Sequence, residues 1–297
     1  MAVFSKQAAE GRWQRCGMGV AGVLVVGAGL VGVPRGVHAD EVSAPPLALM
    51  QTMIAHEYEA EKHREHYEYL SQERSERTGG HLWTERVAET SEGKVKMLLA
   101  EDGQPLQGVR LAAETARLAD VAAHPEEFAK QEQALKNDEA HAKDMLALLP
   151  KAFVFEHVRQ EGGYMKIDFR PNPEYTPQSL EERILHGMSG SVLLEQPVLR
   201  LHGIEARLPE DVSIGFGLLA TIKAGSNFST IRGRVYGDEW KTAMLNTDIT
   251  GRAIFFKAIA KKEHAEHTEF RVLAPGMTVA QAVAMLEKQG VGIGSRE

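Results

Sequence analysis

The chain has 297 residues, of which 43% are hydrophobic and 25% are charged, and its formal net charge at pH 7 is −7. This acidic balance, without a dense block of Lys or Arg, argues against a nucleic-acid partner, because such binding depends largely on neutralising phosphates. The chain contains one cysteine, Cys16, so a structural disulfide within one molecule is excluded.

Residues 1–39 are typical of a bacterial signal peptide. A positively charged start precedes an uncharged, largely apolar run at residues 17–33, and Ala39 suits a cut before Asp40. The run is shorter than the roughly 20 apolar residues of a membrane-spanning helix. We therefore expect cleavage after Ala39, a periplasmic protein and no permanent membrane span, with a retained anchor as the less favoured alternative. The cut would remove Cys16, together with four cations and one anion, leaving a net charge of about −10.

Residues 40–290 are expected to form a single β-rich domain, followed by a flexible tail at 291–297. Its first element is a helix that begins after Pro45, because apolar residues from Leu47 to Tyr58 recur at intervals of three and four. Alternating apolar residues then predict strands around residues 67–69, 83–87 and 95–99. The last two strands are expected to join in a hairpin whose turn includes Gly93 with a positive φ.

A helical insertion is predicted at residues 106–149. The segment is rich in Ala, Glu, Lys and Gln, which favour helices, and apolar residues recur seven apart. Pro125 suits the start of a second helix. We expect an antiparallel helix pair lying on a sheet, in preference to a coiled coil.

The chain then returns to strands, interrupted by a short helix at residues 177–186. Residues 188–274 are expected to form a meander, with turns at 236–239 and 250–252 and a hairpin tip at 263–268. A final helix follows Thr278, which forms a capping box with Gln281, and ends at Gly290. Because no crossover helices intervene, the strands should be antiparallel. The predicted fold class is α+β: a curved, half-barrel-like antiparallel sheet with packed helices and the helical insertion.

Patterns typical of enzymes are missing from the sequence. The serines beside Gly190 do not form the Gly-x-Ser-x-Gly motif of serine hydrolases. Residues 215–217 begin like a dinucleotide-binding loop, but no βαβ pattern surrounds them. We therefore expect a non-enzymatic protein without a cofactor.

Histidines supply the candidate metal sites, the first of them near the end of the first helix. On a continuous helix, Glu59, His63 and His66 would lie on one face at a spacing that can hold a divalent cation. A solvated, charged helix end at residues 57–68 explains the same residues without a metal, and is the favoured interpretation. His264 and His267, at the expected hairpin tip, are weaker candidates.

Large apolar side chains are frequent in the predicted strands. Most are expected to fill a core, but a strongly curved sheet could also leave an apolar concavity for acyl chains, with helices as a lid. The candidate lining residues for such a lipid site are Phe216, Trp240 and Phe256.

The layout of signal peptide, amphipathic helix, long strands and a meander that includes residues 188–192 and 232–240 resembles the periplasmic lipoprotein-carrier and lipoprotein-sorting proteins. The resemblance covers roughly residues 47–274 as architecture. It implies a half-open antiparallel barrel whose apolar concave side receives lipid chains, and no enzymatic activity.

The leading hypothesis is a periplasmic protein that binds a lipid or a lipoprotein. Two alternatives remain open. The sheet could be fully packed, and the protein would then be a structural or protein-interaction module whose acidic helices at 106–149 bind a protein partner. The protein could instead bind a metal, or act as a metal-dependent enzyme, through His63 and His66.

Overall fold

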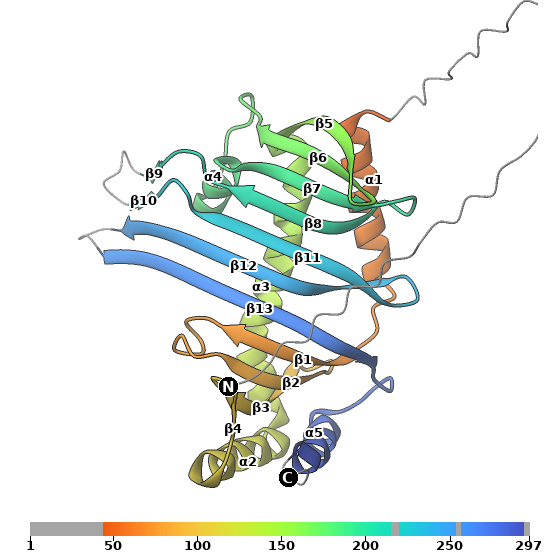
Figure 1. Ribbon diagram of the computed structural model, residues 1–297, viewed down its shortest axis with the longest axis vertical. Helices are drawn as coiled ribbons and strands as arrows, with labels where there is room; N and C mark the ends of the chain where they lie inside the picture. Colours follow the sequence, from red (N-terminus) through yellow and green to blue (C-terminus); the bar gives the residue numbers. More distant parts are fainter. Residues whose placement is uncertain (1–43, 215–219, 254–256, 294–297) are drawn as a thin grey trace, which may run out of the picture. The chain divides into compact units, whose positions relative to one another are not determined.

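The computed structural model describes residues 44–214, 220–253 and 257–293 (Figure 1). The expected signal peptide and the candidate lining residues Phe216 and Phe256 lie outside this part of the chain. The described residues form one compact unit. No helix in the described residues is long and apolar enough to cross a membrane.

A 13-stranded sheet dominates the fold, and the order of its main path is β4-β3-β2-β1-β13-β12-β11-β8-β7-β6-β5. Neighbouring strands are antiparallel, and the path does not close on itself, so the predicted open, curved antiparallel sheet is confirmed. The strands are β1 (Tyr67–Arg74), β2 (Trp83–Glu89), β3 (Lys94–Glu101), β4 (Gln104–Pro105), β5 (Phe153–Glu161), β6 (Tyr164–Pro171), β7 (Ser189–Glu195), β8 (Arg200–Arg207), β9 (Val212–Ile214), β10 (Ala220–Ile222), β11 (Asn227–Tyr236), β12 (Glu239–Ala253) and β13 (Lys257–Val272).

Helices cover one face of the sheet. In Figure 1, α1 and the long α3 both lie behind the strands, and α2 and α5 lie side by side next to β3. Together with the sheet they make the predicted α+β fold class. The helices are α1 (Pro46–Glu61), α2 (Gly108–Ala123), α3 (Pro125–Ala152), α4 (Leu180–His186) and α5 (Val279–Ile293).

The apolar core has two main parts. The larger one joins α1 and the end of α3 to β5, β6, β7 and β8, where Met50, Met53, Ile167 and Leu194 are fully buried. Successive side chains of a strand point to opposite faces, so Met165, Ile167 and Phe169 of β6 all face this core. The second part joins α2 and α5 to β3. The groups described below lie beside the larger core.

The helical segment differs from the prediction in its packing. Two helices form as expected, and Pro125 occupies the first turn of α3. However, α2 packs mainly against α5 and much less against α3. In addition, α3 continues through Pro150 to Ala152, three residues beyond the predicted end.

The first turn of α5 has the predicted capping box, in which Thr278 and Gln281 exchange side-chain hydrogen bonds of 3.0 and 3.3 Å. This helix runs to Ile293, past its predicted end at Gly290 and into the segment expected to be a tail.

Two predicted turns are in fact continuous strand. β12 passes through residues 250–252, where a Cβ on Gly251 would lie 2.5 Å from the Thr221 carbonyl oxygen of β10. This glycine therefore permits a close approach of two strands and does not mark a turn. β13 passes through residues 263–268, so His264 and His267 lie in mid-strand, opposite Arg74 and Ser71.

Gly93 also differs from the prediction. It does lie in the turn between β2 and β3, where its carbonyl accepts a hydrogen bond of 2.8 Å from the Thr90 amide. Its φ is not positive, however, and a Cβ there would lie 2.3 Å from Cγ of Glu132 on α3. A glycine is needed at this turn because α3 passes close to it.

Candidate functional site

An apolar pocket of about 440 Å³ lies between α3, α4 and the face of the sheet that the helices cover. Its size falls within the roughly 300–1,000 Å³ of typical small-molecule sites. Several side chains in its wall, among them Ile184, Ile204 and Phe228, are only partly buried, so the pocket is open to solvent. Its lining consists of Met145, Leu146, Leu149, Phe155, Phe169, Glu181, Ile184, Leu185, Met188, Val192, Ile204, Ala206, Phe228 and Ile249.

The wall of this pocket follows from periodicity in the chain. On α3, Met145 and Leu149 are four residues apart and so lie on one face of the helix. On β5 and β6, Phe155 and Phe169 are paired across the strands and both point toward the helices. One carboxylate, Glu181, is the sole charged residue among those that line the pocket. The pocket can therefore hold an apolar group but offers little to orient a polar one.

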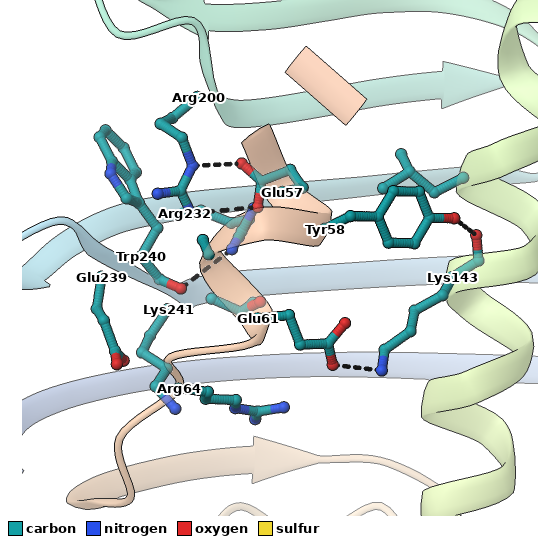
Figure 2. Close-up of a pocket in the computed structure, with 13 residues that line it drawn as sticks. Glu57, Tyr58, Glu61, Arg64, Lys143, Arg200, Arg232, Glu239, Trp240 and Lys241 are labelled. Carbon is teal, nitrogen blue, oxygen red and sulfur yellow. Dashed lines mark hydrogen bonds and ion pairs between the residues drawn. The ribbon is translucent and has the colours of Figure 1, made fainter. Parts of the chain in front are cut away.

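A polar pocket of about 250 Å³ adjoins the apolar one, and Leu146 lines both. Side chains from α1, α3, β8, β11 and β12 converge on it (Figure 2). It is lined by Glu57, Tyr58, Ala60, Glu61, Arg64, Lys143, Leu146, Arg200, Arg232, Glu239, Trp240, Lys241 and Thr242.

Glu57 of α1 is the centre of the ion pairs in the polar pocket. Its carboxylate accepts hydrogen bonds from Nε of Arg200 at 2.8 Å and from Nη1 of Arg232 at 2.5 Å (Figure 2). The Leu201 amide also donates to it, at 3.1 Å. Burial opposes the ionised form of Glu57, but the hydrogen bond from Arg200 and the charge of Arg232 outweigh it, so the pKa of Glu57 lies below its usual value.

The two arginines are held by backbone carbonyls as well. Arg200 donates to the Asp238 carbonyl oxygen at 2.7 Å, and Arg232 donates to that of Trp240 at 3.0 Å. The side chain of Arg200 is 9% exposed and that of Glu57 is 10% exposed. Because a buried charge is costly unless it is paired, this arrangement fixes the position of α1 on the sheet.

Lys143 and Lys241 lie on other walls of the polar pocket. Lys143 of α3 forms an ion pair with Glu61 of α1, and the Tyr58 hydroxyl donates to the Lys143 carbonyl at 3.2 Å. Lys241 of β12 forms a 2.9 Å ion pair with Glu89, and burial lowers the pKa of Lys241. These contacts tie α1, α3 and the sheet together around the pocket.

The candidate lining residues for lipid fall in different places. Trp240 lines the polar pocket and is 8% exposed, and it is not among the residues that line the apolar pocket. Phe216 and Phe256 lie outside the described residues. Sequence patterns could have indicated Phe169 and Val192 as inward-facing strand residues. They could not have indicated Met145 or Leu149, because nothing local shows which strands α3 crosses.

The premise of the candidate metal site is wrong. α1 ends at Glu61, so His63 and His66 do not continue the helical face that carries Glu59. The side chain of His63 is 81% exposed and lies 3.9 Å from a Glu59 oxygen. Within the part of the chain that the structure describes, no three His, Cys, Asp or Glu side chains converge as a metal site would require.

The histidines of β13 have partners in the sheet. Nδ1 of His264 lies 2.5 Å from the Asn246 side-chain oxygen, and Nδ1 of His267 lies 3.0 Å from the Thr242 carbonyl oxygen. Burial lowers the pKa of His267. The ring of His267 also packs against that of Tyr69. These contacts are those of residues built into a sheet.

Comparison with known proteins finds no family model that matches the chain, and no curated protein or solved structure with significant similarity to it.

Proposed function

We propose that this protein is a non-enzymatic, periplasmic binding protein that holds an acyl chain of a lipid or acylated partner in the apolar pocket. The observation that carries the proposal is the pocket itself: apolar side chains from α3, α4 and the sheet line it, and several remain partly exposed. An apolar ligand that covers this surface removes it from water, which makes a favourable contribution to the free energy of binding.

The free energy available is sufficient for a ligand of ordinary length. Burying one CH₂ group contributes about 0.8 kcal/mol, so eight buried groups contribute about 6 kcal/mol before the cost of association is subtracted. The open sheet and the helices on one of its faces are also what the architectural resemblance to lipoprotein carriers implies. The signal-like residues 1–39 support the periplasmic location.

Titration with a neutral, pyrene-labelled long-chain alcohol tests this proposal. The Met145→Gln variant replaces a thioether in the pocket wall by an amide of similar length. A bound acyl chain would remove water from this amide without offering it a hydrogen bond, which is unfavourable. We expect its affinity for the probe to fall about tenfold or more, corresponding to about 1.4 kcal/mol.

Leu135→Gln is the matched control. Leu135 lies on the same helix, is 43% exposed and does not line the apolar pocket. Its affinity for the probe should stay within about twofold of the wild type. Wild-type protein that takes up no probe, or equal affinities in the two variants, would contradict the proposal.

A further inference from the structure

The two pockets are placed so that one amphiphilic molecule can occupy both. Leu146 belongs to both walls, and Lys143 precedes it by three residues on α3. Residues three apart lie on the same side of a helix, separated by a rise of about 4.5 Å. The polar end of a ligand whose chain fills the apolar pocket would therefore lie beside Lys143.

Cations outnumber carboxylates among the residues that line the polar pocket, although the whole chain is acidic. Glu57 pairs with two guanidinium groups, so its single negative charge is shared between Arg200 and Arg232. Among the residues that line the pocket, five are cationic and three are carboxylates. The carboxylate of Glu89, which pairs with Lys241 and lies 3.7 Å from Arg64, offsets this excess in part. The cations are Arg64, Lys143, Arg200, Arg232 and Lys241.

We propose that the polar pocket binds the anionic head group of the acyl ligand, a carboxylate or a phosphate. This inference rests on the proposed function, since it names the head group of the ligand whose chain lies in the apolar pocket. Charge-assisted hydrogen bonds from ammonium and guanidinium groups to such oxygens are about twice as strong as neutral ones.

Lys143 is best placed to make the contact. Its side chain is 43% exposed, and its ammonium group has three donors, of which the ion pair with Glu61 engages one. Arg232, on β11, is 19% exposed and holds Glu57 in place. The same cationic side chains would repel a cationic head group. The pocket should therefore discriminate between ligands by the sign of their charge.

Displacement of the neutral probe by four ligands with the same decyl chain tests the inference. The ligands are decanol, decanoate, decyl phosphate and decyltrimethylammonium. We expect at least one anion to bind about tenfold tighter than decanol, the cation to bind no tighter than decanol, and the anion preference to weaken in high salt. Whether decanoate or decyl phosphate binds more tightly identifies the head group.

Substitutions of two lysines on α3 test whether the preference for anionic ligands arises in the polar pocket. Lys143→Gln should reduce the preference for the anion over decanol to less than about threefold, whereas Lys130→Gln should leave it unchanged. Lys130 is exposed on the same helix, about 20 Å from Lys143 along its axis. The control variant therefore loses the same charge outside the pocket.

The inference and the proposed function fail in different ways. If decanol displaces the probe and both anions bind no tighter, or if Lys143→Gln keeps the full preference, the inference is overturned while the apolar site stands. If no ligand displaces the probe and wild-type protein does not bind it, the proposed function is overturned as well.

Discussion

Glu57 holds together three segments that are far apart in the chain. Its partners Arg200 and Arg232 are 143 and 175 residues away. All three side chains are largely buried. Removing one member of a buried ion network leaves the remaining charges buried without a partner, and this lowers the stability of the folded protein.

We expect Glu57→Gln to lower the free energy of unfolding by about 3 kcal/mol, measured by urea denaturation at neutral pH. Glu59→Gln, the same change two residues away, is the control, because Glu59 is 63% exposed and forms its ion pairs with the nearby Lys62 and His63. Its effect should stay within about 0.5 kcal/mol. Equal effects of the two substitutions would show that the Glu57 network does not stabilise the fold.

The stabilisation from Glu57 should depend on pH. The pKa of Glu57 is lower in the folded protein than its usual value of 4.5. Its contribution is therefore complete above that value and is lost as the pH falls through the lower, folded value. The difference in unfolding free energy between the wild type and Glu57→Gln should shrink between neutral pH and about pH 3. A difference that stays constant over this range would contradict the pKa shift.

The ion pairs of the polar pocket could not be predicted from the sequence. Residues 57–68 were expected to be a solvated, charged helix end, and that holds for Glu59 and His63, which are exposed. It is wrong for Glu57, because the arginines that make its burial possible come from strands more than a hundred residues later. No local pattern shows which charged residue will meet a distant partner.

Glycines in the strands of this protein often mark close approaches between elements. At Gly190 of β7, a Cβ would lie 1.8 Å from the Glu205 carbonyl oxygen of β8. At Gly251 of β12 the neighbouring backbone is that of β10. A glycine that admits a neighbouring strand and a glycine that turns the chain look the same in a single sequence, which explains why a turn was predicted at residues 250–252.

The substitution Gly190→Ala should lower the free energy of unfolding by about 3 kcal/mol, since the new methyl group would force β7 and β8 apart. Gly233→Ala is the matched control: it also lies within a strand, and a Cβ there would meet no atom within 4 Å. We expect its effect to stay within about 0.5 kcal/mol. Comparable losses in the two variants, measured by denaturant unfolding, would refute the close approach of β7 and β8.

Element types were predictable where the pattern is local and strong. The alternation of Met165, Ile167 and Phe169 predicted β6, and Thr278 with Gln281 predicted the start of α5. The neighbours of each element were less predictable. α2 packs mainly against α5, which comes more than 150 residues later, because both present apolar faces to β3.

At the scale of the whole molecule, the open sheet and the helices on one of its faces determine where a ligand can bind. A closed or fully packed arrangement would have filled the space between α3, α4 and the strands with side chains. In this protein that space is a pocket of about 440 Å³ beside a second one of about 250 Å³. The sequence could suggest an apolar concavity, but its size and its polar neighbour depend on how the helices lie on the sheet.

Native mass spectrometry of the protein purified without detergent, combined with lipid extraction, shows whether the apolar pocket carries an acyl ligand. We predict a mass above that of the polypeptide by one acyl amphiphile, which is released on denaturation and recovered in the extract. If the protein stays at its polypeptide mass, and remains so after incubation with acyl ligands, the apolar pocket is not a lipid site.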